Sequence, residues 1–214
     1  MPLYATHYTA AEGGWATWKM TETPDELLRL LPPEGLYATE IARSRLHPKR
    51  LLERLAIRAL MYQCWHEEHA VAYRSDGKPC LTDHKFHISI THTAGYAGLC
   101  WSICPDVSVD MESRGPKALR LASRFMHPDE HADGPSELAA LLHWSAKETL
   151  YKMLPEQEGT DFARDLFIRP FAIENEGIMT GTDRRKASVC HSIAYRLFPD
   201  FVLTWHHPVL MFPR

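Results

Sequence analysis

The sequence lacks several features that would assign it to a specialised class of protein. No apolar run approaches the roughly 20 residues that cross a bilayer, and Met1 to His7 lack the basic-then-apolar layout of a secretory signal. The five cysteines are odd in number and scattered, so they form no disulfide framework. A formal net charge of −3 argues against a dedicated nucleic-acid-binding protein. We therefore expect a cytoplasmic, monomeric protein without a membrane or nucleic-acid partner.

Two patterns that resemble metal sites are incomplete. Cys100 and Cys104 are close in sequence, but no second close pair of cysteines completes a zinc site. Among the 13 histidines, His66 and His69 enclose two glutamates, yet this is not the His-Glu-x-x-His pattern whose spacing stacks two rings on a helix. We interpret this stretch as a solvated helix end, with a metal site as the alternative.

The pattern of elements predicts an α+β fold of two similar lobes. The 214 residues, 45% of them hydrophobic and 24% charged, suit one large domain or two lobes of about 100 residues. Long helices expected at 48–66 and 136–154 are each followed by strand-like runs, without a repeat of the letters themselves. This order predicts two pseudo-repeated lobes, 1–105 and 106–214, each a long helix packed on a mostly antiparallel sheet. In the second half, the strand-like runs are 167–173, 177–180, 188–197 and 201–206.

The first half contains helix signals and a basic stripe. Thr23 and Glu26 have the spacing of a capping box at the start of a short helix. In the helix 48–66, Arg50, Arg54 and Arg58 follow one another at four-residue intervals along one side. This stripe is either a solvated face or a contact for an anionic ligand.

A hairpin follows, with polar residues where its strands meet. Runs 86–90 and 96–103 are predicted to pair, and Thr91, His92 and Thr93 stand before Gly95 in the connection. Hydroxyl and backbone donors in such a turn can hold a phosphate oxygen, whereas the alternative is ordinary turn chemistry. Further along, the run 127–130 has the pattern of a helix start.

Val107 to Glu112 is an apolar run that ends with two acids. In a strand, Asp110 and Glu112 point to one face, and Met111 points to the other. Two carboxylates at one place suit a hard divalent cation such as Mg²⁺, although a strand that ends in solvent gives the same pattern.

The helix 136–154 supplies a third acid. On a helical wheel, Trp144, Glu148 and Lys152 cluster at one edge of the apolar face, which places Glu148 between core and solvent. Lys147 falls toward the side opposite the core, and Trp144 is expected to pack. As an alternative, Glu148 and Lys152 form an ordinary helix pair worth about 0.2–0.5 kcal/mol.

These motifs together resemble those of the 4′-phosphopantetheinyl transferases. Val109-Asp-Met-Glu112 followed by Trp144-Ser-Ala-Lys-Glu148-Thr-Leu-Tyr-Lys152 is similar to the family's Asp-x-Glu and Trp-x-x-Lys-Glu-x-x-x-Lys pair. Upstream, Gly77-Lys78-Pro79 and Ile88-Ser-Ile-Thr-His92-Thr93 resemble two further motifs of the family. The likeness spans roughly residues 48 to 154 and is closest to the two-lobed type, typified by the surfactin synthetase activator.

The resemblance implies an activity and a set of site residues. The family transfers phosphopantetheine from coenzyme A to a serine of an apo acyl or peptidyl carrier protein in fatty-acid, polyketide or nonribosomal peptide synthesis, and releases 3′,5′-ADP. It implies Mg²⁺ held by Asp110, Glu112 and Glu148, with Glu148 and Lys152 as catalytic residues. The residues expected to hold coenzyme A are Lys78, Thr91, His92, Thr93, Arg50, Arg54 and Arg58.

Some residues depart from the family pattern. Ser108 replaces a glycine before the Val-Asp pair, and Thr91 replaces a serine while keeping the hydroxyl. The lysines that grip the 3′-phosphate of coenzyme A in the family have no match between Glu34 and Tyr37. The candidates for that role are Arg43, Arg45 or the stripe of Arg50, Arg54 and Arg58. Two rival functions are a non-catalytic relative that binds carrier protein or coenzyme A, and a Mg²⁺-dependent phosphohydrolase.

Overall fold

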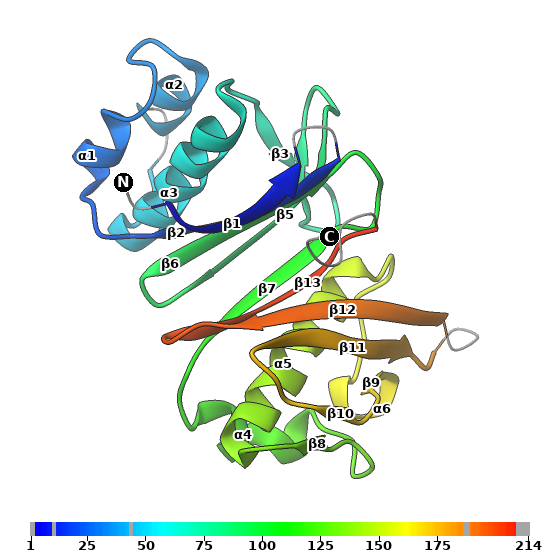
Figure 1. The fold of residues 1–214 in the computed structure, drawn as a ribbon. Helices are drawn as coiled ribbons and strands as arrows, with labels where there is room; N and C mark the ends of the chain where they lie inside the picture. The colour runs from blue at the N-terminus through cyan, green and yellow to red at the C-terminus, as the bar shows by residue number, and fades with distance from the viewer. Residues whose placement is uncertain (1–2, 10–11, 43–44, 186–188, 209–214) are drawn as a thin grey trace. The chain divides into compact units, whose positions relative to one another are not determined.

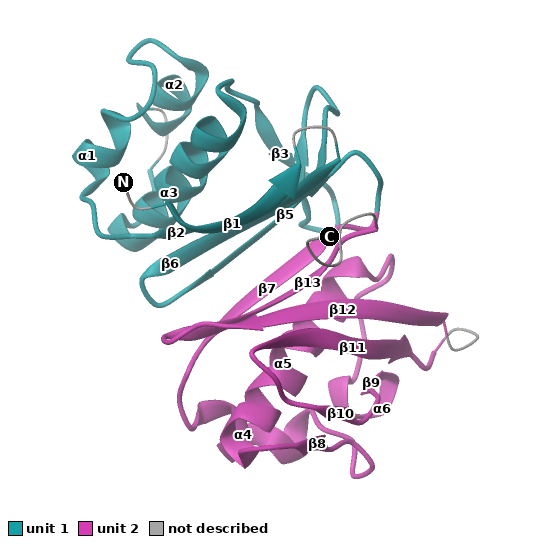
Figure 2. Cartoon of the chain, viewed as in Figure 1, with its two compact units in different colours: residues 1–105 teal, residues 106–214 magenta. Residues whose placement is uncertain are grey.

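The computed structural model describes residues 3–9, 12–42, 45–185 and 189–208. The chain divides into two compact units, Met1–Pro105 (unit 1) and Asp106–Arg214 (unit 2), which Figure 2 colours separately. Each unit combines helices with sheets, and the α+β class expected from the sequence is confirmed.

Unit 1 is built on an antiparallel sheet with the strand order β1-β2-β6-β5. A two-residue turn joins β5 to β6, and Gly95 in this turn has a φ of 75°, which a residue without Cβ adopts without strain. The strands of this sheet are β1 (Leu3–Thr9), β2 (Gly13–Lys19), β5 (His87–Thr93) and β6 (Tyr96–Ser102).

One long helix, α3 (Pro48–Trp65), packs against the β2 and β6 strands of this sheet (Figure 1). Leu55 and Leu60 on the buried side of this helix pack with Trp18 and Trp101 of the sheet in one hydrophobic core. The remaining elements of unit 1 are α1 (Pro24–Leu28), α2 (Leu36–Ala42), β3 (Val71–Tyr73) and β4 (Pro79–Leu81), the last two paired antiparallel.

The start of α1 confirms the capping box. The Thr23 hydroxyl accepts a hydrogen bond from the Glu26 N–H, and the Glu26 carboxylate accepts one from the Thr23 N–H at 2.8 Å. This satisfies donors that the helix itself leaves unpaired.

Unit 2 is built on a five-stranded antiparallel sheet with the order β7-β13-β12-β11-β9. The β8 and β10 strands form a separate two-stranded parallel pair. The strands of unit 2 are β7 (Ser108–Ser113), β8 (Ala132–Asp133), β9 (Leu166–Ile168), β10 (Phe171–Ala172), β11 (Glu176–Asp183), β12 (Val189–Leu197) and β13 (Phe201–His206).

The long helix of unit 2, α5 (Ser136–Met153), packs on one face of the five-stranded sheet (Figure 1). Leu142 and Leu150 of the helix join Ile193 and Val202 of the sheet in the second hydrophobic core. The shorter helices are α4 (Lys117–Leu121), the 3₁₀ turn η1 (Ala122–Arg124) and α6 (Phe162–Asp165).

The two sheets share a topological pattern. In each unit, the last strand of the main sheet that precedes the long helix pairs with the final strand of the unit, which pairs in turn with the strand before it in sequence. The resulting orders are β2-β6-β5 in unit 1 and β7-β13-β12 in unit 2. The similarity of pattern expected from the sequence is therefore also one of strand order.

Three local expectations differ from the structure. Residues 127–130 form a turn, not a helix start, because the Glu130 carboxylate points inward and accepts the backbone N–H of His127 and of Ile168, each at 2.6 Å. Thr91 to Thr93 lie in the last part of β5, so the connection is shorter than expected. The strand expected over 188–197 corresponds to β12 (Val189–Leu197), and its first expected residue, Ser188, lies outside the described residues.

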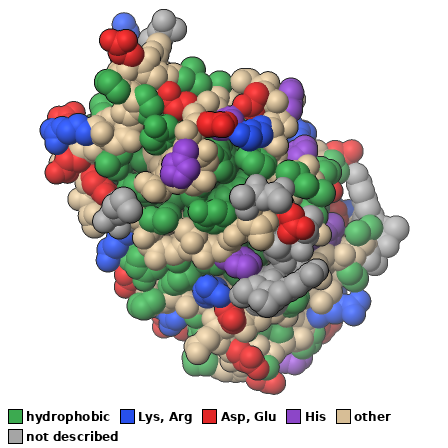
Figure 3. Space-filling view, turned by 45° about the horizontal axis from the view of Figure 1, so that its top comes forward, with side chains coloured by type: hydrophobic (Ala, Val, Ile, Leu, Met, Phe, Trp, Pro, Cys, Tyr) green, Lys and Arg blue, Asp and Glu red, His purple; other side chains and the backbone are tan. Residues whose placement is uncertain are grey.

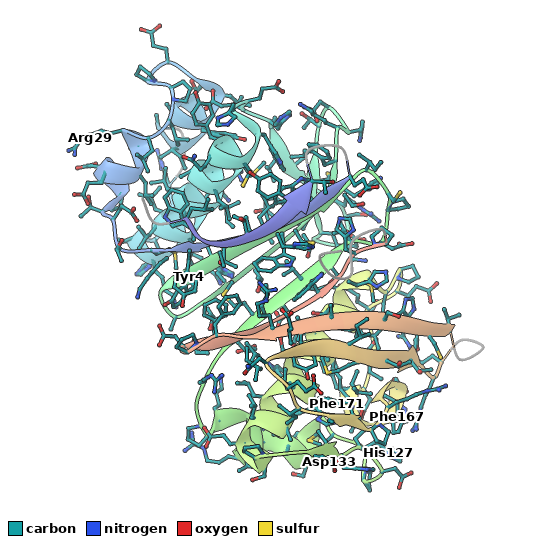
Figure 4. The ribbon with its side chains drawn as sticks, viewed as in Figure 1. Tyr4, Arg29, His127, Asp133, Phe167 and Phe171 are labelled. Carbon is teal, nitrogen blue, oxygen red and sulfur yellow. The ribbon has the colours of Figure 1, made fainter. Side chains whose placement is uncertain are left out.

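The charges are mixed on the face of the molecule that Figure 3 shows, where acidic and basic side chains are interspersed among hydrophobic ones. Within the described residues, no helix combines the length and the apolar character needed to cross a membrane.

Candidate functional site

The acids of β7 are turned toward α5. Asp110 and Glu112 pair in register with Thr204 and Val202 of β13, and both Asp110 and Thr204 are hydrogen-bonded to Ser145 of the helix. Because side chains alternate along a strand, Glu112 shares this face, as expected from the sequence. The two carboxylates therefore lie at the junction of the sheet and α5.

Three side chains of α5 donate to these carboxylates. The Ser145 hydroxyl donates to Asp110 Oδ2 at 2.9 Å, and the Trp144 indole N–H donates to Glu112 Oε1 at 2.8 Å. About two turns further along, Lys152 Nζ donates to Asp110 Oδ1 at 2.8 Å and to the Val109 carbonyl at 2.9 Å. Asp110 is 5% exposed, so its charge is balanced by protein groups more than by solvent.

Glu148 belongs to the same electrostatic cluster. Burial raises its pKa to about 7, and the negative charges of Asp110 and Glu112 act in the same direction, while Lys152 opposes them. The pKa of Glu112 is also raised, first by burial and then by Asp110. The charge of Asp110 thus makes ionisation of Glu112 and Glu148 harder, which is how acids that share a small volume behave. We call Asp110, Glu112 and Glu148 the acidic cluster.

The donor chemistry of the acidic cluster fits a hard divalent cation. Carboxylate oxygens are the ligands that Mg²⁺ prefers. A dication would stabilise the buried negative charge of Glu148, whose pKa is raised first by burial and then by the neighbouring acids. In the part of the chain that the structure describes, no three His, Cys, Asp or Glu side chains have the geometry of a formed metal site. The assignment of these acids to Mg²⁺ stays a prediction.

In unit 1, the predicted phosphate-binding residues divide into two groups. Arg50 Nη1 lies 2.8 Å from His92 Nε2 and 3.0 Å from Glu53 Oε2, so the first turns of α3 are joined to the end of β5. The Arg50 side chain is 65% exposed and open to solvent. Thr91 is buried beside His92, and Thr93 is half-buried.

Arg54 and Arg58 are engaged by a neighbouring helix. Arg58 donates to both carboxylate oxygens of Glu40 in α2, at 2.9 and 2.8 Å, and its side chain is only 2% exposed. Arg54 lies 3.4 Å from the same carboxylate. The basic stripe therefore joins α3 to α2 over most of its length. Lys78 Nζ lies 4.0 Å from Asp76 Oδ2.

The metal alternative for residues 66–69 finds no support in their contacts. His66 ends α3 in a left-handed conformation, and the Glu68 carboxylate accepts the backbone N–H groups of Leu36 and Tyr37 at the start of α2. His69 is buried and hydrogen-bonded to Asp83, so the solvated helix end expected there is wrong for this residue.

The sequence placed Lys147 incorrectly. Its side chain is fully buried, and Nζ donates to the carbonyls of Phe125 and Phe162 and lies 2.7 Å from Glu130 Oε2. Burial lowers the pKa of Lys147, and Glu130 opposes this shift. The expected solvent side of α5 is covered because the chain around η1 and α6 packs on it. A hint was present in the mostly apolar and small residues on both sides of Lys147.

One comparison with known protein families found a match in unit 2. The family model of the 4′-phosphopantetheinyl transferase superfamily matches residues 106–204. The match runs from the start of unit 2 into β13 and includes every residue of the acidic cluster together with Lys152. No curated protein matches the chain.

Proposed function

Residues 106–204 are a domain of the 4′-phosphopantetheinyl transferase superfamily, and on this premise we propose that the chain modifies carrier proteins. It transfers the 4′-phosphopantetheine group of coenzyme A to a serine of an apo acyl or peptidyl carrier protein, depends on Mg²⁺ and releases 3′,5′-ADP. The observation that carries the proposal is the acidic cluster, which gathers three carboxylates and Lys152 where β7 meets α5.

Each residue of the cluster has a part in the transfer. Asp110, Glu112 and Glu148 would hold Mg²⁺, which would supply positive charge to neutralise the pyrophosphate and so favour attack at the β-phosphorus. Glu148 would also orient the attacking serine hydroxyl and accept its proton. The bond between the serine Oγ and the β-phosphorus forms as the bond between that phosphorus and the bridging oxygen of the pyrophosphate breaks, and the bridging oxygen leaves with 3′,5′-ADP. Lys152 balances the charge that remains on the departing 3′,5′-ADP.

Unit 1 contributes the candidates for binding coenzyme A. Arg50 with His92, together with Lys78, Thr91 and Thr93, offers cationic and hydroxyl groups for phosphate oxygens. The pairing of Arg54 and Arg58 with Glu40 supports a structural duty for these two arginines instead.

Transfer is tested directly by mass. The protein is incubated with coenzyme A, Mg²⁺ and a panel of apo carriers from fatty-acid, polyketide and peptide synthesis. A mass gain of one phosphopantetheine on at least one carrier, lost when EDTA replaces Mg²⁺, supports the proposal. No gain on any carrier would sink it, and breakdown of coenzyme A without a carrier would indicate a phosphohydrolase.

A further inference from the structure

Three carboxylates near one another repel, so their side chains turn apart unless donors hold them. A site that must present these oxygens together therefore needs groups that fix each carboxylate from behind. Lys152 fixes Asp110 from one side.

Two consecutive residues of α5 meet this need. Trp144 Nε1 donates to one oxygen of Glu112, and the Ser145 hydroxyl donates to one oxygen of Asp110. Successive residues of a helix point about 100° apart, so they reach two different positions of the facing strand. Asp110 and Glu112 are two apart in β7, which gives each donor its own acceptor on one face.

The donor on Trp144 is itself held on several sides. Its indole packs against the Phe125 ring edge-to-face at 5.0 Å between centroids and against the Phe162 ring at 5.5 Å. The backbone carbonyls of the same two phenylalanines accept hydrogen bonds from buried Lys147, at 2.6 and 2.8 Å. The ammonium of Lys147 thus fixes the walls of the slot in which Trp144 sits.

The donor on Ser145 belongs to a buried set of hydroxyls. Ser145 Oγ lies 2.8 Å from Thr204 Oγ1, which lies 2.7 Å from Thr149 Oγ1. The Ser108 hydroxyl donates to the Thr149 carbonyl at 2.7 Å and fastens the start of β7 to the helix. Ser145, Thr149 and Thr204 are fully buried, so packing and these hydrogen bonds set the position of the Ser145 hydroxyl.

We propose that Trp144 and Ser145 are positioning residues that hold Glu112 and Asp110 in the orientation needed to bind a divalent cation. The inference rests on the proposed function and adds to it that the motif tryptophan acts through its N–H as well as through its ring. Groups that orient metal ligands typically contribute about 10- to 100-fold in metal affinity or activity. Loss of either donor therefore weakens cation binding while the fold persists.

The test compares Trp144→Phe and Ser145→Ala with Ser108→Ala. Phenylalanine keeps an aromatic ring between Phe125 and Phe162 but lacks the N–H. Ser108→Ala removes a buried hydroxyl whose acceptor is the Thr149 carbonyl and not a carboxylate. Mn²⁺ binding is measured by electron paramagnetic resonance, with and without coenzyme A, and transfer is measured as a function of Mg²⁺ concentration.

Trp144→Phe and Ser145→Ala are each expected to weaken Mn²⁺ binding about tenfold and to raise the Mg²⁺ concentration for half-maximal transfer. Ser108→Ala is expected to stay within about twofold of the unsubstituted protein. Folded variants that bind Mn²⁺ as tightly as the unsubstituted protein overturn the inference, and so does a lack of Mn²⁺ binding by the unsubstituted protein in both conditions. Mn²⁺ binding that depends on both donors, without transfer to any carrier, supports positioning but contradicts the proposed function.

Discussion

At the scale of single residues, the two strand acids show what a sequence can predict. Asp110 and Glu112 point to one face because side chains alternate along any strand. Their spacing of two residues is therefore enough to predict the shared face. The partners of these acids could not be predicted in the same way. Ser145 and Trp144 donate to them because α5 lies in one particular register on β7 and β13, which depends on the packing of the whole core.

Glu148 is the residue whose loss should affect transfer most directly. Glu148→Gln keeps the shape of the side chain but removes both the negative charge and the proton acceptor. We expect transfer to fall at least about 100-fold, with circular dichroism and the unfolding midpoint close to those of the unsubstituted protein.

Glu137→Gln is the matched control, because Glu137 is an exposed acid in the first turn of the same helix. Unchanged transfer by Glu148→Gln would mean that this carboxylate is not part of the reaction.

His143 provides a pH dependence of stability that is separate from the acidic cluster. Its ring is fully buried against Phe171 with Nδ1 2.7 Å from the Ala139 carbonyl. Burial lowers the pKa of His143, and Lys147 acts in the same direction, whereas Glu130 opposes it. As the pH falls, His143 is therefore protonated at a higher pH in the unfolded chain than in the folded protein.

From this sign, stability is independent of His143 above its ordinary pKa of 6.5 and falls as the pH drops below that value. Thermal unfolding between pH 8 and pH 5 measures the slope, and His143→Phe should flatten it below about pH 6.5. His131 contributes to the same pKa shift and stays in the variant, so the difference between the two curves isolates His143. Parallel curves would contradict the prediction.

At the scale of elements, sequence patterns located the long helices well and the short polar segments poorly. The long helix of unit 2 was expected over 136–154 and spans Ser136–Met153, since its apolar spacing is regular. Residues 127–130 also carried a helix-start pattern, but Glu130 there serves Lys147 and the backbone of Ile168. Such a contact joins residues far apart in sequence, so no local pattern announces it.

The Lys147–Glu130 pair is expected to be strongly coupled. Lys147→Met or Glu130→Gln alone disrupts a fully buried ion pair and is expected to cost about 3–5 kcal/mol of unfolding free energy. The double substitution Lys147→Met/Glu130→Gln should cost clearly less than the sum, because neither charge is then left alone.

Urea unfolding of the four proteins provides the cycle. Lys49→Met, at a lysine whose side chain is 78% exposed, is the control and should change the free energy by less than about 0.5 kcal/mol. Strictly additive costs for the two single substitutions would show that the pair does not act as a unit.

At the scale of the whole molecule, the family match and the acidic cluster fall in unit 2, while the candidate phosphate-binding residues fall in unit 1. The similar helix-and-strand order of the two halves could be predicted from the sequence, because the period of the hydrophobic residues changes at similar places in each half. The duties of the individual arginines in unit 1 could not, because their partner Glu40 belongs to a different helix.

The arginines of α3 are expected to separate into binding and structural residues. Arg50→Ala should raise the KM for coenzyme A several-fold and leave stability nearly unchanged, since its side chain is exposed. Arg58→Ala should instead lower the unfolding free energy by about 2 kcal/mol or more, because it leaves Glu40 without its bidentate partner.

Transfer kinetics and urea unfolding of both variants make the comparison. A stable Arg58→Ala protein with a raised KM would return this residue to the nucleotide site. An unchanged KM in Arg50→Ala would remove Arg50 from it.

The enclosure of Lys147 has a chemical consequence. Acylating reagents attack an amine only when they can reach it, and here two carbonyls and a carboxylate surround the nitrogen in a fully buried position. A reagent therefore meets this amine only when α5 parts from the chain around η1 and α6. The rate at which Lys147 is acylated therefore reports how often unit 2, which holds the acidic cluster, opens locally.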